Sequence, residues 1–357
     1  MKVLLLSRYG VQGASSRMRF YQYLPWLSSA GIECVAAPLI TDNALTKKYG
    51  SGGYGANRLL HAYRQRIAAL LKRHRFDLVW VEKEALPWLP AWCERVLLKG
   101  VPYVLDFDDA IFHNYDRHRL ALVRGLFGHR IDRVMAGARL VVAGNSYLAQ
   151  RAAAAAAPWV ELLPTVVDIE RYAVPDDRLL PMRDGKPRIV WIGSPSTARY
   201  LDLLAEPLAE LAKERPFALR VIGGGNLSMP GVDVEVQPWS ADTEVAAIAD
   251  CDVGVMPLID SPWEQGKCAY KLIQYMACGL PTVASPVGAN CEVVVEGETG
   301  LMAATPDEWV RNLRLLLGNR ELRQRLGAAG KKRVEAQYSL QCAAPRLVRM
   351  LQKAGGQ

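Results

Sequence analysis

Short apolar runs and longer amphipathic segments alternate along the first half of the chain. The short runs are bounded by polar or turn-forming residues, which is typical of strands buried in a sheet. They lie at residues 2–6, 33–37, 78–81, 103–105 and 140–143. The amphipathic segments between them are long enough to be crossover helices of a parallel sheet. They lie at residues 17–29, 58–75, 88–98, 117–136 and 147–157.

A second series of the same kind begins after residue 187. Its predicted strands are residues 189–192, 219–222, 253–256 and 282–284. Its predicted helices are residues 197–214, 243–249 and 269–277. Strands that alternate with helices in this way predict an α/β fold with two Rossmann-like, doubly wound domains in tandem.

Turn-forming residues indicate where one domain ends and the next begins. Residues 174–187 contain three prolines and are predicted to be a linker. We therefore expect an N-terminal domain at residues 1–173 and a C-terminal domain at residues 188–338. Residues 339–357 are expected to form a helix that packs back on the first domain. Ligands bind at the carboxyl ends of parallel strands, and we expect those ends of the two sheets to face each other across a cleft.

Length, composition and charge narrow the class of protein. Half of the 357 residues are hydrophobic, which suits two domains with real cores. The seven cysteines are scattered and no apolar run approaches the roughly 20 residues of a membrane span, so a cytoplasmic protein is expected. Residues 1–180 carry 24 basic and 16 acidic side chains, whereas the remainder carries 20 of each. This basic half favours an anionic membrane surface or a phosphorylated lipid as partner, rather than nucleic acid.

The turn after the first strand of the second domain has features of a phosphate-binding site. Gly193 and Ser194 lead into a predicted helix that carries Arg199. Backbone N–H groups at the start of a helix attract anions, and Arg199 adds a positive charge. These residues predict a diphosphate site. An ordinary βα turn with a serine or threonine cap accounts for them equally well.

Two further glycine-containing segments are candidates for ligand contacts. Gly223 and Gly224 follow a predicted strand and allow close passage of a base or ribose, although they equally suit a loose turn. Gly266 precedes a predicted helix and lets a ligand approach the backbone. Lys267 and Lys271 are four residues apart, so on one helix they would point at the same anion. A pair of solvated lysines is the alternative.

Several segments of the second half match the motifs of one family. In that family a strand ends in Gly-Arg-Leu, and a lysine lies six residues after the glycine. Here Gly193 is similar to that glycine, Ser194 stands in the place of the arginine and Arg199 in the place of the lysine. Residues 274–281 are similar to the family motif Glu-Ala-Met-Ala-x-Gly-x-Pro. Two segments within residues 287–301 are similar to the motifs that follow it in the family. The chain therefore resembles retaining glycosyltransferases of family 4, also called glycosyl transferases group 1, which have the GT-B fold.

The resemblance implies transfer of a sugar from a nucleoside-diphosphate sugar to an acceptor hydroxyl, with retention of anomeric configuration. The C-terminal domain would bind the donor and the N-terminal domain the acceptor. Arg199 with Lys267 or Lys271 would stabilise the departing diphosphate, so no metal or other cofactor is required. Gln274, in place of a family glutamate, would hold the ribose through its amide. Glu264 would hold hydroxyls of the donor sugar.

Acidic residues after a strand of the first domain predict the acceptor side. Asp108 or Asp109 stands where the family has a histidine motif, and Arg17 and His113 are further candidates for acceptor contacts. Asp108 alternatively caps the next helix or pairs with Arg17. The spacing of Asp106 and Asp108 is also the Mn²⁺ or Mg²⁺ signature of the other glycosyltransferase fold.

Other functions remain open at this stage. A nucleotide-sugar epimerase of the same fold needs carboxylates and a histidine but no acceptor. A nucleotide-sugar-binding protein without turnover is suggested by Gln274 and by the absence of the family's first glutamate. The basic first half favours cell-envelope polysaccharide or glycolipid assembly at the inner face of the plasma membrane, and a natural-product acceptor is the alternative.

Overall fold

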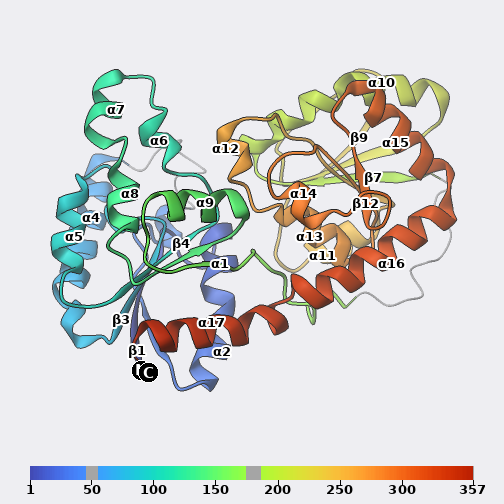
Figure 1. The fold of residues 1–357 in the computed structure, drawn as a ribbon. Helices are drawn as coiled ribbons and strands as arrows, with labels where there is room; N and C mark the ends of the chain where they lie inside the picture. The colour runs from blue at the N-terminus through green and yellow to red at the C-terminus, as the bar shows by residue number, and fades with distance from the viewer. Residues whose placement is uncertain (46–54, 174–185, 357) are drawn as a thin grey trace. The chain divides into compact units, whose positions relative to one another are not determined.

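The computed structural model divides the chain into two compact units. It describes residues 1–45, 55–173 and 186–356 (Figure 1). Unit 1 comprises Met1–Thr165, Gln265–Cys268 and Ala343–Gln357, and unit 2 comprises Val166–Glu264 and Ala269–Cys342. Most of the predicted linker at residues 174–187 lies outside the described residues. Four residues from the second half of the sequence therefore pack in unit 1, together with the C-terminal residues.

Unit 1 is built on a parallel sheet whose described strands follow the order β2-β1-β3-β4-β5-β6 (Figure 1). The strands are β1 (Lys2–Leu6), β2 (Glu33–Ala36), β3 (Leu78–Glu82), β4 (Tyr103–Phe107), β5 (Leu140–Ala143) and β6 (Val160–Leu162). Every residue of β3, β4 and β5 is buried, which explains the continuous apolar runs at residues 78–81, 103–105 and 140–143. The five strands predicted for this half are confirmed. Strand β6 escapes prediction because the sequence Val-Glu-Leu contains no apolar run.

Three predicted helices of unit 1 are each divided in the structure, and the one predicted at 58–75 forms α4 and η2. The described helices are α1 (Ala14–Arg19), η1 (Tyr21–Tyr23), α2 (Leu24–Ser29), α4 (Ala56–Leu71), η2 (Arg73–Arg75), α5 (Ala91–Leu98), α6 (His113–Asp116), α7 (Ala121–Phe127), α8 (Arg130–Met135) and α9 (Ser146–Ala154). A single helix at 17–29 is wrong because Phe20 leaves helical geometry, with φ −131°, and packs its ring 4.5 Å from that of Trp80. A single helix at 117–136 is wrong because α7 and α8 are separate, and Gly128 lies between them.

Unit 2 is a second parallel sheet, in the order β12-β11-β10-β7-β8-β9. Its strands are β7 (Arg188–Ile192), β8 (Ala218–Ile222), β9 (Asp233–Gln237), β10 (Val253–Met256), β11 (Thr282–Ala284) and β12 (Gly300–Met302). Its helices are η4 (Pro195–Leu204), α10 (Ala205–Glu214), α11 (Glu244–Ala249), α12 (Pro262–Gln265), α13 (Tyr270–Ala277), α14 (Asn290–Val293), α15 (Pro306–Gly318) and α16 (Arg320–Gln337). The α/β fold class predicted from the sequence is therefore present in both units.

The core of unit 2 lies on both faces of its sheet. In β7, Val190 and Ile192 pack in one hydrophobic cluster, whereas Ile189 and Trp191 pack in another. Successive residues of a strand point to opposite faces, so this alternation shows that helices cover both sides. Successive apolar residues are typical of such a strand, and the short apolar run at residues 189–192 is what identified it in the sequence.

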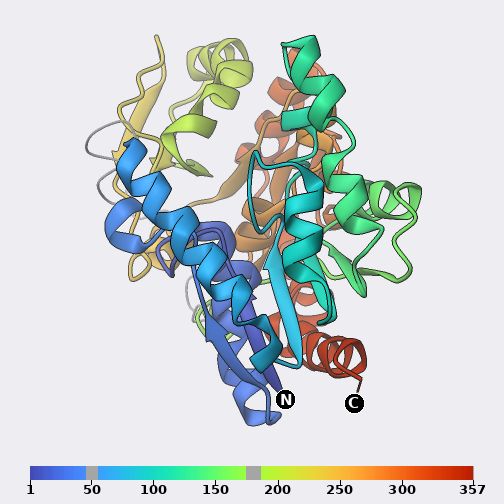
Figure 2. The ribbon, with the colours of Figure 1, turned by 90° about the vertical axis from the view of Figure 1, so that its left-hand side faces the viewer.

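The last helix, α17 (Leu340–Ala354), belongs to unit 1 from Ala343 onward. Arg346 Nη2 donates to the Leu162 carbonyl at 2.9 Å, and Lys353 Nζ lies 4.5 Å from the centroid of the Trp159 ring. These contacts attach the helix to the edge of the sheet at β6. The two ends of the chain consequently lie near each other in unit 1 (Figures 1 and 2).

The described residues contain neither a membrane-spanning helix nor a disulfide. None of their helices combines the length and the apolar character that a membrane span requires. None of the seven cysteines forms a disulfide bond.

The predicted helix at 147–157 ends earlier than its alanine-rich sequence suggests. Helix α9 stops at Ala154, and Ala156 has φ +58°, in the left-handed region. The N–H groups of Ala156 and Ala157 turn back to the carbonyls of Ala153 and Ala152, at 2.9 and 3.1 Å. This pattern of bonds is the usual glycine-terminated helix end, here made by alanine at a steric cost.

Replacing Ala156 with glycine should therefore stabilise the protein. We expect Ala156→Gly to raise the free energy of unfolding by about 1 kcal/mol, because glycine adopts a positive φ without strain. Chemical denaturation measures this change. Ala153→Gly, within the same helix, is the control and should destabilise by about 1 kcal/mol. Equal effects of the two substitutions would contradict this account of the helix end.

Candidate functional site

A strained turn at the carboxyl end of β3 begins the candidate site of unit 1. Lys83, directly after the strand, has φ +63°, a conformation that costs a non-glycine residue on the order of 1–3 kcal/mol. The Glu84 N–H approaches the Glu82 carbonyl to 2.6 Å and closes a three-residue turn. The Lys83 N–H donates to the Asp106 carbonyl at 2.8 Å. Such strain persists only where surrounding contacts hold it, and it clusters at functional sites.

Lys83 bridges two carboxylates that follow β4. Its Nζ lies 2.7 Å from Asp108 Oδ1 and 3.0 Å from Asp109 Oδ2. Ser15 donates a short hydrogen bond to the other oxygen of Asp108. Burial alone would raise the pKa of Asp108, yet the charge of Lys83 and the hydrogen bonds from Lys83 and Ser15 lower it below its usual value. Asp108 is thus an anion fixed in position, while the side chain of Asp109 is 32% exposed and more accessible.

Asp108 has two partners that the sequence did not suggest. Its carboxylate accepts hydrogen bonds from Lys83 and Ser15. Arg17 is half-buried on α1, and its Nη1 lies 3.4 Å from the Val11 carbonyl. An acceptor contact for Arg17 stays a prediction.

Asp106 is the other carboxylate of the Asp-x-Asp spacing, and it is also paired. Its Oδ1 lies 2.7 Å from Arg19 Nε, and both side chains are 1% exposed. Burial raises the pKa of Asp106 to about 6, although the charge of Arg19 lowers it. A divalent cation would have to displace Arg19 from Asp106 and Lys83 from Asp108. Among the described residues, no group of three or more His, Cys, Asp or Glu side chains is arranged to hold a metal ion. The ion pairs therefore weigh against the Mn²⁺ or Mg²⁺ alternative.

Charged residues at the carboxyl end of β3 are the part of this site that the sequence analysis missed. Glu82 is buried, and it accepts hydrogen bonds from Ser16 Oγ at 2.5 Å and from the Arg8 N–H at 2.6 Å. Glu84 is buried beside Arg130, whose Nη1 lies 2.6 Å away. The run Glu-Lys-Glu directly after the predicted strand at residues 78–81 could have indicated this site. Charged residues at such a position are either exposed to solvent or paired with residues distant in sequence.

His113 is held by two neighbours. Its Nδ1 lies 2.8 Å from Asp116 Oδ1 and its Nε2 lies 2.8 Å from the Tyr147 hydroxyl. Burial lowers the pKa of His113, while Asp116 raises it. Since both ring nitrogens are already engaged, an acceptor has to compete with protein partners to bind this side chain. The acceptor contact predicted for His113 remains a prediction.

Gly266 serves protein packing in unit 1. A Cβ at this position would come within 2.4 Å of Ala110 Cβ. Asn145 Nδ2 donates to the Gln265 and Lys267 carbonyls at 3.2 and 2.9 Å, which fixes the segment against the end of β5. The glycine is therefore required by a contact with Ala110, and the sequence argument that it admits a ligand is unnecessary.

Lys267 and Lys271 do not share a helical face, which corrects the sequence analysis. Ala269 has φ +52°, and helix α13 begins only at Tyr270. Lys267 consequently lies before the helix and in unit 1, whereas Lys271 lies within it and in unit 2. Lys271 Nζ is 5.4 Å from the centroid of the Trp191 ring, within range of a cation–π interaction.

Arg199 and Glu264, both predicted from the sequence, come together in unit 2. Arg199 Nη2 lies 3.9 Å from Glu264 Oε1, and its guanidinium lies 5.2 Å from the centroid of the Tyr200 ring. The hydroxyls of Tyr200 and Ser261 each donate a short hydrogen bond to Glu264. The side chain of Arg199 is 66% exposed while that of Glu264 is 3% exposed. Glu264 and Tyr200 thus hold the Arg199 side chain in place, while its guanidinium remains exposed to solvent.

The helix that carries Arg199 differs from the predicted one. Residues Pro195–Leu204 form the 3₁₀-helix η4, and α10 continues from Ala205. The Ser194 N–H donates to Thr197 Oγ1 at 3.2 Å, and the Thr197 N–H donates to the Ser194 carbonyl at 2.9 Å. Thr197 therefore satisfies the backbone N–H of Ser194, as the capping alternative expects.

The glycines near this helix are required by the packing of the protein itself. A Cβ on Gly193 would lie 2.5 Å from the Trp191 ring. Gly223 has φ +76°, and its Cβ would lie 2.6 Å from the Gly193 carbonyl. A Cβ on Gly224 would lie 2.5 Å from a methyl of Val221. The loops after β7 and β8 therefore touch, so these glycines need no ligand to account for them.

Gln274 lies in the core of unit 2. Its side chain is 3% exposed, and its Nε2 donates to the Tyr172 hydroxyl at 2.8 Å. Tyr172 is itself buried in the hydrophobic cluster that contains most of α13. The structure thus gives Gln274 a protein partner, and a ribose contact stays a prediction.

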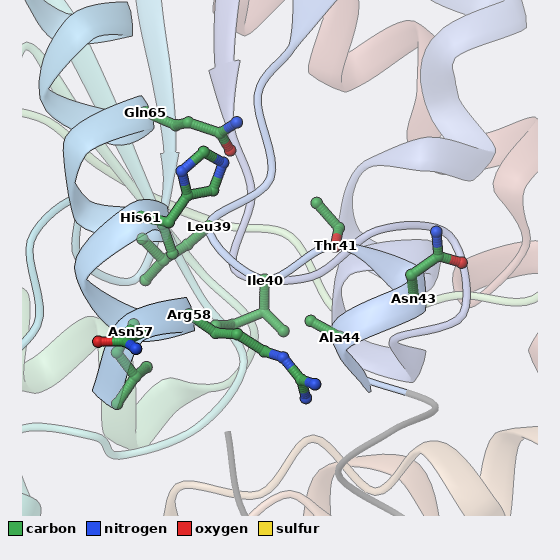
Figure 3. Close-up of a pocket in the computed structure, with 11 residues that line it drawn as sticks. Leu39, Ile40, Thr41, Asn43, Ala44, Asn57, Arg58, His61 and Gln65 are labelled. Atoms are coloured by element: carbon green, nitrogen blue, oxygen red, sulfur yellow. The ribbon is translucent and has the colours of Figure 1, made fainter. Parts of the chain in front are cut away.

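A cavity of about 320 Å³ lies beside α4 in unit 1 (Figure 3). Leu39 and Ile40, which follow β2, form its apolar side. Arg58, His61 and Gln65 project from α4 on the opposite side (Figure 3). An apolar floor with a few polar groups is typical of small-molecule sites.

Comparison with known proteins identifies the type of domain in the second half. Residues 186–319 match a family model described as Glycosyl transferases group 1. Spore coat protein SA of Bacillus subtilis (strain 168) is 32% identical over 81 residues, which are 22% of each chain. An uncharacterized glycosyltransferase of Methanocaldococcus jannaschii is 37% identical over 62 residues, which are 17% of this chain and 18% of that one. The matched stretches thus span about a fifth of the length of these curated relatives.

Solved structures resemble the chain over nearly its full length. HepE from Anabaena, in complex with UDP and glucose, matches with a TM-score of 0.74 and 14% identity over 99% of this chain and all of that one. Sucrose-phosphate synthase from Thermosynechococcus elongatus matches with a TM-score of 0.73 and 15% identity over 99% of this chain and 98% of that one. At such low identity the likeness shows the fold. The predicted GT-B fold with two Rossmann-like domains is confirmed, and the chain carries a glycosyltransferase domain.

The ion pair at Asp108 should make the stability of the protein depend on pH. Asp108→Asn should lower the free energy of unfolding at pH 7 by about 3 kcal/mol, because it leaves a buried lysine with one carboxylate fewer. The folded-state pKa of Asp108 is lower than its unfolded value, so its stabilising effect is present above roughly pH 4 and is lost as the pH falls through the folded pKa. The difference between the two proteins should therefore shrink below pH 4.

Urea denaturation between pH 7 and pH 3 measures this dependence. Glu33→Gln is the control, because its exposed ion pair with Lys2, 3.5 Å long, should contribute little at any pH. A deficit for Asp108→Asn that stays constant with pH would show that the carboxylate charge is not what stabilises the site.

Proposed function

We propose that this protein is a glycosyltransferase that moves a sugar from a nucleoside-diphosphate sugar to an acceptor hydroxyl, with retention of anomeric configuration as in family 4. The observation that carries the proposal is the match of residues 186–319 to a glycosyl transferases group 1 domain. The HepE complexes with UDP and with UDP-glucose support a nucleotide-sugar donor, since HepE shares the fold.

Arg199 and Lys271 are the proposed cations of the donor site. As the bond between the anomeric carbon and the phosphate oxygen breaks, negative charge develops on the departing diphosphate. Fixed positive charges stabilise that charge, and they need no metal ion to do so. Arg199 suits the role because Glu264 and Tyr200 hold a guanidinium that remains exposed. Lys267, which packs in unit 1, is a further candidate.

Unit 1 is the proposed acceptor domain. Asp108 is held ionised by Lys83 and can accept a hydrogen bond from the acceptor hydroxyl, and Asp109 contacts the same lysine. Asp109 is the more exposed carboxylate and is the proposed contact with the hydroxyl. The cavity beside α4 lies at the end of β2, and its apolar side suits another part of the acceptor.

The basic character of residues 1–180 supports an acceptor carried at an anionic surface. We accordingly propose a peripheral location at the inner face of the plasma membrane, with a lipid-linked or saccharide acceptor in polysaccharide or glycolipid assembly. The positive charge of this half would attract anionic lipids and a phosphorylated acceptor alike.

One observation favours a second function. Gln274 is buried and already bonded to Tyr172, and the loss of its contact with the donor ribose would fit a nucleotide-sugar-binding protein without turnover. Such a protein would bind a nucleotide-sugar and consume none of it with any acceptor. An epimerase of the same fold would change its nucleotide-sugar in the absence of acceptor.

The first measurement is the unfolding temperature in the presence of UDP-, GDP-, ADP- and dTDP-sugars, with EDTA or with Mn²⁺. A ligand that binds only the folded protein raises this temperature. We expect one nucleotide class to stabilise the protein in EDTA. Stabilisation that requires Mn²⁺ would instead favour a metal-dependent donor site at Asp106 and Asp108. No response to any nucleotide would contradict the proposed donor site.

Arg199→Ala and Lys271→Ala should each weaken binding of the nucleoside diphosphate at least about tenfold, because a hydrogen bond to a charged group contributes about 1.5–3 kcal/mol. Calorimetric titration with the diphosphate and with the corresponding nucleoside separates the phosphate contribution. Turnover of the donor should fall about 10²-fold or more. Lys213→Ala, an exposed lysine on α10, is the control. Equal affinities for the three variants and the native protein would refute the assignment of these cations.

A further inference from the structure

Helix α7 in unit 1 exposes apolar side chains along its whole length. None of its seven residues is buried. Leu122 and Leu126, one turn apart, are 73% and 63% exposed, and Leu120 directly before the helix is 54% exposed. In both views α7 projects from the sheet beyond α6 and α8 (Figures 1 and 2). Single exposed leucines are ordinary, whereas three within seven positions on a projecting helix indicate a surface that meets a partner.

Contacts at both ends hold α7 in place. Arg124 Nη1 donates to the His118 carbonyl at 2.7 Å, and the centroid of the Phe127 ring lies 6.2 Å from that of Tyr115. Gly128 is buried, and a Cβ there would come within 2.4 Å of the Arg124 carbonyl. The exposure of the leucines is therefore a property of a positioned helix.

A tryptophan belongs to the same region. The Trp88 ring packs 4.9 Å from Tyr115 and 5.9 Å from His118, yet it remains 49% exposed. Its backbone has φ +61°, which costs energy for a bulky residue. Its N–H donates to the Tyr115 hydroxyl at 3.1 Å, so the fold maintains this conformation. Tryptophan with one polar edge is enriched where a protein meets the boundary between lipid and water.

Exposed basic residues lie close to these leucines in the sequence. Residues 117–131 contain no aspartate or glutamate, and Arg117, Arg119 and Arg124 are exposed. The acidic residues on either side, Asp116 and Asp132, are both engaged by Arg151, at 3.0 and 2.7 Å. The charge of the exposed arginines is thus not cancelled by these two neighbouring carboxylates.

We propose that this surface, called here the α7 patch and made of Trp88, Leu120, Leu122, Leu126 and the three arginines, binds the surface of an anionic lipid bilayer. The leucines and the indole would enter the boundary between headgroups and acyl chains, and the arginines would bind lipid phosphates. This inference rests on the proposed function, because it identifies the element that would bring unit 1 to a membrane-borne acceptor.

Charge decides between the possible occupants. A second copy of the chain meeting the same patch would place arginines against arginines, which opposes association. The patch therefore requires a partner that is both apolar and anionic, and an anionic bilayer offers both over an extended surface. Interfacial helices with leucine on one face and arginine or lysine on the other bind membranes in this way.

Co-sedimentation of the full chain with lipid vesicles tests the proposal. The probes are vesicles of phosphatidylcholine alone and of phosphatidylcholine with phosphatidylglycerol at about 3:1. We expect binding to the anionic vesicles and much weaker binding to the neutral ones, with an affinity that falls as salt is raised, since surface charge interactions are screened.

Variants of the patch separate its apolar and charged parts. The double substitution Leu122→Gln and Leu126→Gln should reduce partitioning onto anionic vesicles at least about tenfold, because burial of each leucine is worth about that factor or more. Arg117→Gln with Arg119→Gln should reduce it by about tenfold or more and weaken the salt dependence. Leu315→Gln, an exposed leucine of α15 in unit 2, is the matched control and should bind as the native protein does.

Other outcomes overturn the proposal. No binding of the native protein to anionic vesicles, or equal binding by the native protein and the double-leucine variant, excludes the patch as the membrane contact. A concentration-dependent dimer in analytical ultracentrifugation that the double-leucine variant abolishes assigns the patch to a second copy instead. Stabilisation by nucleotide is measured on every variant: if it is retained while vesicle binding is absent, only the membrane inference fails, and if it is absent while vesicle binding persists, only the proposed donor site fails.

Discussion

The requirement that buried charges be paired governs the carboxyl edge of the sheet in unit 1. Asp106 is paired with Arg19, and Asp108 and Asp109 share Lys83. An ionised group removed from water without a partner costs several kcal/mol, so removing Asp106 or Asp108 alone would leave a buried cation short of a partner. The network holds Lys83 in a strained backbone conformation and keeps Asp108 ionised. The acceptor chemistry proposed for unit 1 depends on this rigidity.

Unit 2 meets a different physical requirement. Its glycines let the loops after β7 and β8 approach each other, and the short 3₁₀-helix η4 then carries Arg199 outward. Glu264 is buried beneath it and is satisfied by two hydroxyls. The exposed guanidinium of Arg199, held in place by Glu264 and Tyr200, suits an anionic ligand that comes from solution. The paired carboxylates of unit 1 instead suit a neutral hydroxyl. The two units thus offer complementary chemistry for a transfer reaction.

The distribution of charge and of exposed apolar side chains concerns the surface and not the fold. All of the net charge lies in residues 1–180, and the leucines of α7 lie among exposed arginines in that half. Neither feature stabilises the folded chain, since exposed leucines gain nothing from burial and like charges repel. The membrane proposed as partner is both anionic and partly apolar, so it would account for both features.

The sequence alone determined the α/β class and the main strands of both sheets, because strands buried on both faces form short and mostly apolar runs. It also placed Arg199 after the first strand of unit 2. The tertiary structure decided which charges meet. Lys83 lies 25 residues from Asp108 in sequence, and no local pattern reports their contact at 2.7 Å. It also decided that Ala269 takes a left-handed conformation, which places Lys267 outside the helix of Lys271. Periodicity is a local property that the chain carries in its order of residues, whereas ion pairs and strained turns arise only when segments distant in sequence pack together.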